Sequence, residues 1–427
     1  MKLKNFKIGI LGLGYVGLPL AVAFAKKYTV IGFDINKERV DELNNYNDST
    51  LEIDNVLLKS VLNRNSGKPG LNLTALESDL KNCNFYIITV PTPIDKYNRP
   101  VLTPLENATK TVAALMNEGN IVVYESTVYP GVIEDKMVPI IEKISKLVYN
   151  EEFYCGYSPE RINPGDKEHT ITKILKVTSG STPQIADLID NLYGSVITAG
   201  TFKAPSIRVA EAAKVIENCQ RDINIAFVNE LSKIFNHIGI DTYEVLKVAS
   251  TKWNFLNFKP GLVGGHCISV DPYYLAQKAQ EIGYHPEIIL AGRRLNDSMG
   301  IHVAKEVIKL MMRKGLKVSS SKALILGFTF KEDCPDTRNT QVIDIFNELI
   351  SYDMKVDVHD PWVNPKEVST EYNIDILTKK PNLSNYSAII LCVAHKKFLE
   401  IDISTNNNCV VFDVKGMLSK ENVDARL

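Results

Sequence analysis

The strongest constraint on the fold is an alternation of short apolar runs with helical segments. Over about residues 1–200, runs rich in β-branched and aromatic residues, such as KIGILGL and NIVVYEST, alternate with helical stretches such as GLPLAVAFAKKY. Strands separated by helices in this way pair as a parallel sheet with helices on both faces. The alternation restarts at KALILGFTF, after the polar stretch KGLKVSSSK, and predicts a second α/β unit of about 110 residues.

A long helical segment separates the two alternating regions. Residues 206–239 carry apolar side chains at helical spacing, and no glycine or proline interrupts them before Gly239. At 1.5 Å per residue such a helix is roughly 50 Å long, which suits a connection between two domains or two subunits. The predicted fold class is α/β, with two doubly wound parallel sheets joined by a long central helix. The predicted domains are residues 1–203, 204–316 and 317–427.

The composition excludes some classes of partner. The 427 residues include 49 basic and 50 acidic side chains, so no net positive charge favours nucleic acid or an anionic membrane surface. The seven cysteines are scattered without the spacing of a zinc site, which predicts no metal and a reducing, cytoplasmic setting. An apolar run behind Lys2, Lys4 and Lys7 resembles a signal peptide, but the glycines within it have a better explanation.

That explanation is the motif G-x-G-x-x-G at Gly12, Gly14 and Gly17, which follows a predicted strand and opens a predicted helix. The first glycine permits a tight turn, the second lets a pyrophosphate approach the backbone, and the third lets the helix pack close to the strand. Asp34 ends the next strand, where a carboxylate accepts hydrogen bonds from ribose hydroxyls and repels a 2′-phosphate. We therefore expect a Rossmann-like site for NAD rather than NADP. A glycine-rich turn with a surface aspartate is the alternative, and Arg39 offers a cation to adenine or to a phosphate.

Further polar residues follow later strands, at the edge where open parallel sheets bind ligands. The stretch VPTP places Pro91 and Thr92 there, and ESTV places Ser126 and Thr127. Ser126 and Thr127 are candidates for lining the nicotinamide end of the cofactor.

The second α/β unit lacks the triple glycine and has only Gly327 after its first strand. We expect it to bind something other than a second dinucleotide. The following stretch, FKEDCPDTRN, supplies Lys331 and Arg338 where phosphates would lie by the same topological argument. A solvated cluster of charges is the alternative.

A few residues could carry chemistry. Cys267 follows two glycines in GLVGGHCISVDPYY, and Asp271 lies four residues beyond it. Backbone N–H groups or a nearby cation lower a thiol pKa and make the cysteine a nucleophile, whereas a buried, inert cysteine is the common alternative. Lys214 and Asn218 lie four apart on one face of the long helix, either as a catalytic pair or as ordinary helix surface. Glu160 follows a strand in YSPER, where a surface turn would explain it equally well.

Together these motifs resemble the UDP-glucose/GDP-mannose dehydrogenase family. The stretches GLGYVGLP, VPTP, STV, SPER, EAAKVIEN, GGHCISVDPYY and FKEDCPDTRN occur in the family's order and approximate spacing over nearly the whole chain. The resemblance implies an NAD-binding Rossmann domain, a central helical dimerisation domain with the cysteine loop, and a C-terminal Rossmann-like domain that binds UDP. It also implies a homodimer built around the long helix and a four-electron oxidation of a nucleotide sugar at C6 by NAD, for capsule or O-antigen synthesis.

The resemblance also implies residue roles. Cys267 would hold the C6 aldehyde as a thiohemiacetal and then as a thioester. Lys214 and Asn218 would stabilise the oxyanion at C6, and Glu160, Thr127 and Asp271 would position and activate water. The residues implied for NAD are Gly12, Gly14, Tyr15, Val16, Gly17, Asp34, Arg39, Pro91, Thr92, Ser126, Thr127 and Lys331. Those implied for the sugar nucleotide are Glu160, Arg161, Lys214, Asn218, Gly264, His266, Lys331, Arg338 and Arg294. Arg293 and Arg294 are together candidates for a contact with a phosphate or carboxylate, from the same or the neighbouring subunit.

His266 before the cysteine, and SPERINPGD at the end of the strand-like run EEFYCGYSP, resemble the branch of the family that oxidises UDP-N-acetylhexosamines. We expect UDP-N-acetylglucosamine or UDP-N-acetylgalactosamine as the substrate. UDP-glucose and UDP-N-acetylmannosamine are the nearest alternatives, because only a few pocket contacts separate these sugars. A two-electron hydroxy-acid dehydrogenase is an alternative of another class, and it would need neither Cys267 nor the second α/β domain. An inactive NAD-binding sensor would not need this set of reactive residues.

Overall fold

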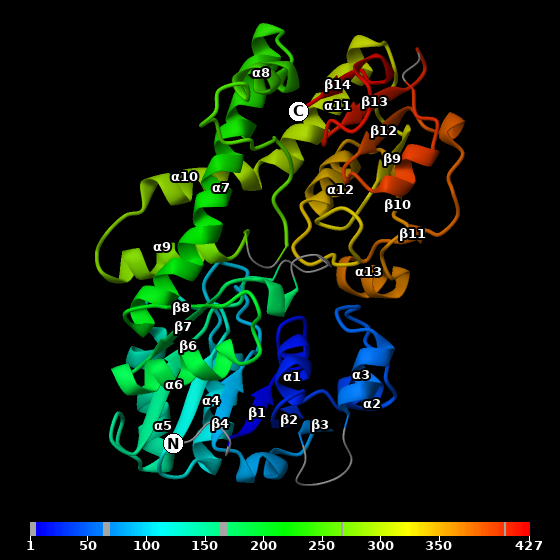
Figure 1. Cartoon of the computed structure of the whole chain (residues 1–427). Coiled ribbons are helices and arrows are strands. Elements are labelled where there is room, and N and C mark those ends of the chain that lie inside the picture. The colour runs from blue at the N-terminus through cyan, green and yellow to red at the C-terminus, as the bar shows by residue number, and fades with distance from the viewer. Residues whose placement is uncertain (1–5, 63–68, 163–169, 266–267, 405–406) are drawn as a thin grey trace. The chain divides into compact units, whose positions relative to one another are not determined.

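The computed structural model describes residues 6–62, 69–162, 170–265, 268–404 and 407–427. The chain divides into two compact units, Met1–Glu217 (unit 1) and Asn218–Leu427 (unit 2), and each is described by itself. Each unit contains one sheet with helices packed on it (Figure 1). Within the described part of the chain, no helix has both the length and the apolar character that crossing a bilayer would require. The division into three domains stays a prediction.

Unit 1 is built on an eight-stranded sheet with the order β3-β2-β1-β4-β5-β6-β7-β8. Its strands are β1 Lys7–Leu11, β2 Thr29–Phe33, β3 Gly70–Thr74, β4 Phe85–Ile88, β5 Asn120–Tyr124, β6 Phe153–Tyr157, β7 Lys176–Gly180 and β8 Thr201–Lys203. The strands from β3 to β6 pair in parallel, in the order of a Rossmann sheet with its switch point between β1 and β4. This confirms the predicted parallel sheet. In addition, β7 runs antiparallel to β6 and parallel to β8.

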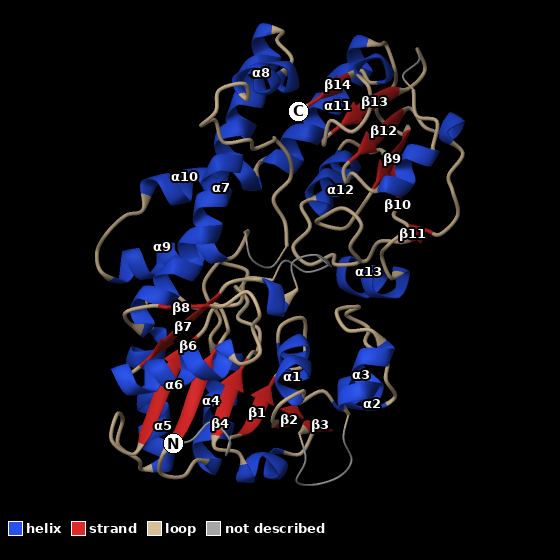
Figure 2. Ribbon diagram, in the orientation of Figure 1, coloured by secondary structure: helices blue, strands red, loops and turns tan. Residues whose placement is uncertain are grey.

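Among the described residues of unit 1, six α-helices precede the long helix, and they pack around the sheet (Figure 2). They are α1 Gly17–Ala25, α2 Lys37–Asn44, α3 Asn55–Val61, α4 Thr103–Leu115, α5 Val138–Ser145 and α6 Pro183–Gly194. Helix α1 reads GLPLAVAFA, and all of its residues are buried. The apolar run that resembles a signal peptide is thus strand β1 followed by a fully buried core helix, which is why it has no polar face.

Unit 2 holds a second sheet of six parallel strands, in the order β11-β10-β9-β12-β13-β14. Its strands are β9 Lys322–Leu326, β10 Lys355–His359, β11 Ile376–Leu377, β12 Ala388–Leu391, β13 Val410–Asp413 and β14 Ala425–Arg426. Its helices after the long one are α8 Thr242–Ala249, α9 Asp271–Glu281, α10 Glu287–Asp297, α11 Met299–Arg313, α12 Val342–Ser351 and α13 Pro365–Tyr372. The strand order again reverses beside the first strand, here β9, as in a Rossmann sheet. The second predicted α/β unit is therefore confirmed.

Helix α7, Ile207–Ile238, is a single helix of 32 residues and confirms the long helix predicted over 206–239. It begins in unit 1 and continues into unit 2. Along it, Ile216, Phe227 and Ile234 are 53%, 55% and 48% exposed, while Val215 and Val228 beside them are buried. The helix thus has a core face and also keeps large apolar side chains on its outside.

Candidate active site

The glycine-rich turn between β1 and α1 has the geometry of a dinucleotide-binding turn. Gly12 has a φ of 95°, in the left-handed region that favours glycine. A Cβ on Gly17 would lie 1.9 Å from the Gly12 oxygen and 2.4 Å from Thr89 Oγ1, so only glycine fits there. A Cβ on Gly14 would meet nothing within 4 Å, which leaves this backbone open to a ligand. These features fit the pyrophosphate of NAD at the start of α1.

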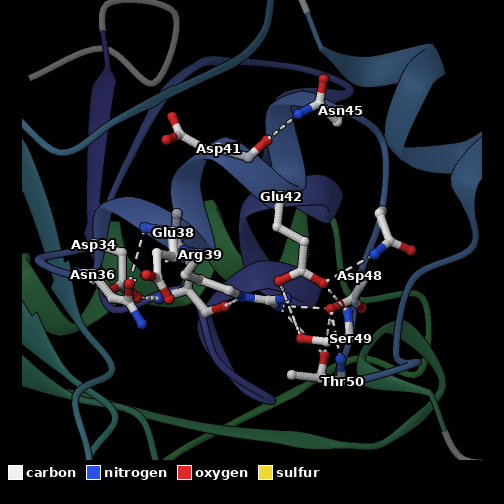
Figure 3. Close-up of polar contacts among 12 residues, drawn as sticks. Asp34, Asn36, Glu38, Arg39, Asp41, Glu42, Asn45, Asp48, Ser49 and Thr50 are labelled. Atoms are coloured by element: carbon white, nitrogen blue, oxygen red, sulfur yellow. Dashed lines mark hydrogen bonds and ion pairs between the residues drawn. The ribbon is translucent and has the colours of Figure 1, made fainter.

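Asp34 follows β2, and its carboxylate is fixed beside the glycine turn (Figure 3). Asp34 Oδ2 accepts a hydrogen bond from the Leu13 N–H at 2.8 Å, and Oδ1 accepts one from the Asn36 N–H at 2.9 Å. A carboxylate held in this place can accept hydrogen bonds from both ribose hydroxyls. The residues present therefore fit NAD, as predicted from Asp34.

The Arg39 side chain forms ion pairs and hydrogen bonds with other residues of the protein (Figure 3). Its guanidinium lies 2.6 Å from Asp48 Oδ1 and 3.1 Å from Glu42 Oε2, and its Nε donates to the Leu13 oxygen at 3.0 Å. Burial raises the pKa of Asp48, but hydrogen bonds from Thr50 and Arg39 outweigh it and hold that pKa below its ordinary value. The arginine thus joins the loop after α2 to the glycine turn, and its contact with the cofactor stays a prediction.

The loops after β4 and β5 are joined by two hydrogen bonds. Thr92 Oγ1 donates to the Thr127 oxygen at 2.8 Å, and Ser126 Oγ donates to the Val90 oxygen at 2.6 Å. The hydroxyls of Thr92 and Ser126 therefore hold the loops together, and their contacts with NAD stay predictions. Pro91 is exposed and Thr127 is half-buried, so both present surface beside these loops.

Glu160, in the segment after β6, is held at both carboxylate oxygens. Its Oε1 accepts hydrogen bonds from the N–H groups of Arg161 and Ile162 at 2.6 and 2.5 Å. Its Oε2 lies 3.1 Å from Nζ of the buried Lys176. The Arg161 guanidinium itself donates to Glu217 at 2.5 Å, so it is paired with α7. The structure thus places Glu160 beside a lysine that was not predicted from the sequence.

Lys214 and Asn218 lie one turn apart in α7 and are 6% and 5% exposed. Neither is therefore ordinary helix surface. Asn218 Nδ2 donates to Asp271 Oδ2 at 2.5 Å, and Asp271, the first residue of α9, is 1% exposed. Within unit 2 the structure brings together two of the residues that the sequence motifs singled out.

The glycine-rich loop of residues 261–265 is fixed by its neighbours in unit 2. Asn229 of α7 makes two hydrogen bonds to the backbone of Gly261, at 2.8 and 3.0 Å. Gly265 has a φ of 84°, and a Cβ on Gly264 would lie 2.7 Å from the Asn339 oxygen. The loop therefore requires Gly264 and Gly265. Asn229 was not predicted because an asparagine inside a long helix has no sequence signature.

His266 and Cys267 lie outside the described residues, so their roles stay predictions. The six other cysteines are all buried. Burial raises the pKa of Cys83 and Cys219 to about 12 and that of Cys409 to about 11. These thiols stay protonated near neutral pH and are poor nucleophiles.

A cavity of about 240 Å³ in unit 2 carries two lysines that the sequence motifs did not single out. Lys259, Gly261, Glu332 and Lys415 contribute to its lining. The pKa of Lys415 lies below the ordinary value of a lysine. Burial lowers it most, Glu332 partly offsets this effect, and Lys259 lowers the pKa further. The sequence signal for both lysines is slight, because FKPG and DVKG are common loop compositions.

Two of the basic residues predicted near the nucleotide, Lys331 and Arg338, lie in the segment between β9 and α12. The Lys331 side chain is half-buried, and the Arg338 guanidinium lies 2.5 Å from Asp336 Oδ2. Arg294 is exposed on α10.

Arg293, the neighbour of Arg294, is only 2% exposed and pairs with Asp222 at 2.6 Å. Its side chain therefore pairs inside unit 2, and its contact with a phosphate or carboxylate stays a prediction.

Three family models match the chain in succession. The NAD binding domain of the UDP-glucose/GDP-mannose dehydrogenase family matches residues 6–197, its central domain 208–298 and its UDP binding domain 324–420. The chain is also 54% identical over 430 residues to UDP-N-acetyl-D-glucosamine 6-dehydrogenase of Pseudomonas aeruginosa, and the match covers 100% of both sequences. The chain belongs to the UDP-glucose/GDP-mannose dehydrogenase family. It is an NAD-dependent nucleotide-sugar dehydrogenase.

Other members of the UDP-glucose/GDP-mannose dehydrogenase family agree in sequence and in structure. UDP-N-acetyl-D-glucosamine 6-dehydrogenase of Salmonella typhi is 56% identical over 430 residues, with 100% of this chain and 99% of that protein covered. The structure of a UDP-D-ManNAc dehydrogenase from Pyrococcus horikoshii superposes with a TM-score of 0.88 at 29% identity, covering 98% of each chain. The family assignment thus extends over the whole length of the chain.

Gly14→Ala should weaken NAD binding without disturbing the fold. The added Cβ meets no protein atom, and the φ of Gly14 is outside the left-handed region, so alanine fits the free protein. The methyl group would occupy the space through which the pyrophosphate approaches the backbone, and we expect the Kd for NAD to rise at least about tenfold. Isothermal titration calorimetry measures the Kd.

A matched control is Gly194→Ala in α6, where the added Cβ would lie 3.8 Å or more from its neighbours. This variant should bind NAD as the wild type does. An unchanged Kd in Gly14→Ala would show that the pyrophosphate does not approach this turn.

Proposed function

We propose that the enzyme oxidises C6 of UDP-N-acetylglucosamine to the uronic acid, a four-electron reaction that consumes two NAD⁺. The observation that carries the proposal is the identity of 54% and 56%, over the full length, to two relatives named UDP-N-acetyl-D-glucosamine 6-dehydrogenase. UDP-N-acetylgalactosamine is the second candidate, because it differs only in the configuration of one hydroxyl. UDP-N-acetylmannosamine and UDP-glucose follow.

The reaction needs a covalent hold on C6 between its two oxidations. NAD⁺, when bound, accepts the hydride that leaves C6 in each oxidation. In our proposal the Cys267 thiolate adds to the C6 aldehyde and forms a C–S bond, so that the carbon stays in place as a thiohemiacetal. Loss of the second hydride leaves a thioester, and attack by water breaks the C–S bond, releases the thiolate and gives the carboxylic acid.

The polar residues have separate tasks in this proposal. The Lys214 ammonium and the Asn218 amide stabilise the oxyanion that forms at C6. Asp271, whose Oδ2 accepts the hydrogen bond from Asn218, is the base toward the hydrolytic water. Thr127 and Glu160 orient water and the C6 hydroxyl. The support for this set is the burial of Lys214, Asn218, Glu160 and Asp271, since burial strengthens electrostatic interactions.

The UDP end of the substrate requires cations. We propose that the cavity lined by Lys259 and Lys415 receives the diphosphate, because an anion would offset the charges of these two neighbouring lysines. Lys331, Arg338 and Arg294 are further candidates for contacts with the nucleotide. The match of residues 324–420 to the UDP binding domain supports this end of the proposal.

We also propose a cytoplasmic homodimer that serves surface polysaccharide synthesis, capsule or O-antigen. The apolar side chains of Ile216, Phe227 and Ile234 on α7, each about half exposed, are the proposed centre of the dimer interface. Analytical ultracentrifugation tests this, because a monomer at micromolar concentration would contradict it.

One experiment tests the substrate and the electron count together. The enzyme is incubated with NAD⁺ and, separately, with UDP-N-acetylglucosamine, UDP-N-acetylgalactosamine, UDP-N-acetylmannosamine and UDP-glucose, and NADH and uronic acid are quantified. We expect the highest kcat/KM for UDP-N-acetylglucosamine and two NADH per acid. A ratio near one would point to a two-electron dehydrogenase, and a preference for another sugar would replace the proposed substrate.

A further inference from the structure

A buried lysine lies between two carboxylates in unit 1, and these carboxylates belong to residues that follow β5 and β6. Lys176 Nζ lies 2.7 Å from Glu125 Oε2 and 3.1 Å from Glu160 Oε2. Lys176, Glu125 and Glu160 are 2%, 1% and 9% exposed. The second oxygen of Glu125 accepts a hydrogen bond from the Tyr193 hydroxyl at 2.6 Å. Neither Lys176 nor Glu125 has a role in the reaction as proposed so far.

The antiparallel strand β7 explains how the lysine reaches this place. Tyr157 at the end of β6 pairs with Ser179 of β7, and continuing this register sets Glu160 opposite Lys176. If β7 ran parallel to β6, its first residue would lie at the other edge of the sheet. The reversal therefore brings an ammonium group to the edge where β5 and β6 end, which is the edge where a parallel sheet binds its ligands.

Burial of this cluster is costly. One ammonium and two carboxylates lose most of their hydration, and well-packed apolar side chains would serve stability as well or better. Glu125 directly precedes Ser126 and Thr127, and Glu160 is proposed to orient water. The lysine thus connects two segments that carry predicted site residues.

The geometry indicates what the lysine does. Two backbone N–H groups hold Oε1 of Glu160, but Oε2 has Lys176 as its partner among the contacts described above. A carboxylate with donors on both oxygens presents its remaining lone pairs in fixed directions. Without the ammonium, one oxygen would lose its anchor and the direction in which Glu160 accepts a hydrogen bond would vary.

We propose that Lys176 is a positioning residue for the oxidation at C6: it fixes the Glu160 carboxylate in the orientation in which it holds water or the C6 hydroxyl, and Glu125 acts only through Lys176. The inference deepens the proposed function and rests on it, because it assigns Lys176 to that same site, whereas Glu125 is only the buried partner of the lysine. Lys176 and Glu125 touch neither the substrate nor NAD in this proposal.

The test separates positioning from stability by removing charges in pairs. Glu125→Gln keeps the shape of the side chain and leaves Lys176 paired with Glu160. Glu125→Gln/Lys176→Met then removes the ammonium without leaving a second buried carboxylate. The pair of variants differs only at Lys176, and circular dichroism with thermal unfolding verifies that both fold.

We expect Glu125→Gln to keep kcat for UDP-N-acetylglucosamine within about threefold of the wild type. Adding Lys176→Met should lower kcat at least about tenfold while the Kd for NAD changes less than about twofold. Adding Glu160→Gln to each of these two variants should lower kcat much less when Lys176 is already absent, because the two residues act as one unit. Equal losses in both backgrounds, or a folded Lys176→Met variant with unchanged kcat, would overturn the proposal.

A second measurement does not depend on activity. Burial raises the pKa of Glu125 to about 7 from its ordinary 4.5; Lys176 on β7 and Tyr193 on α6 lower it, and Glu160 after β6 raises it. At Glu125 the folded chain therefore binds a proton that the unfolded chain releases, and the contribution of this group to stability falls as the pH rises from about 4.5 to about 7. In Glu125→Gln this decrease should be absent, so its thermal midpoint should change less over that range. Identical pH dependence in both proteins would overturn the charge arrangement around Lys176, whatever the activity of the enzyme. Failure to oxidise any of the UDP-sugars would instead overturn the proposed function and leave this measurement unaffected.

Discussion

Cys267→Ser should lower the formation of uronic acid by at least about 10³-fold while NAD and UDP-N-acetylglucosamine still bind. A serine hydroxyl is a far weaker nucleophile than a thiolate and does not hold the C6 aldehyde through the second oxidation. The variant should therefore release at most one NADH per sugar, and the aldehyde should be trapped by added hydroxylamine. Chromatography of the sugar products, with absorbance of NADH in the same reaction, measures both quantities.

The matched control is Cys409→Ser, the same substitution at a buried thiol of unit 2. Cys409 is 4% exposed, and its Sγ lies 3.5 Å from the Val410 oxygen, a contact that a serine hydroxyl can keep. Burial raises the pKa of this thiol to about 11, so we assign it no nucleophilic role. It should give two NADH per acid at the wild-type rate. Acid formation by Cys267→Ser at that same rate would refute the thioester mechanism.

The parts of the molecule that follow local sequence rules could be predicted. The alternation of strands and helices predicted both parallel sheets, and the unbroken apolar spacing predicted α7 within one residue at each end. Gly12 and Gly17 were predictable because their tasks are steric: one needs a left-handed φ and the other has no room for a Cβ. The sequence alone therefore identified the place where NAD fits.

The parts that depend on tertiary pairing could not be predicted. Lys176 reads as a charged residue at the start of a strand, and only the antiparallel pairing of β7 buries it against Glu160. Arg293 and Arg294 are identical neighbours in the sequence, yet the helix turns one inward and the other to solvent. Burial and pairing of these charges follow from long-range packing, which no local pattern carries.

Arg293→Met should destabilise unit 2 by about 3–5 kcal/mol, the cost of leaving a buried charge without its partner. The Arg293 guanidinium pairs with Asp222, which is fully buried, and with Asp297. Burial raises the pKa of Asp222 and Arg293 lowers it, so removing the arginine raises it further. Because the variant then folds better with Asp222 protonated, its loss of stability should be smaller near pH 5 than near pH 8. Urea unfolding followed by tryptophan fluorescence measures this, since both tryptophans, Trp253 and Trp362, belong to unit 2.

Two variants decide whether the buried pair is the cause. Arg294→Met makes the same change one residue along α10 at an exposed position, and surface changes of this kind usually alter stability by less than about 0.5 kcal/mol. Arg293→Met/Asp222→Asn removes the stranded charge, while the amide still accepts the hydrogen bond from Asn296, now 2.7 Å from Asp222 Oδ1. The double variant should therefore recover at least about 1 kcal/mol relative to Arg293→Met. If it is as unstable as the single variant, the loss comes from the packing of the long arginine side chain and not from the charge of Asp222, because the two proteins differ only in the replacement of this carboxylate by a neutral amide.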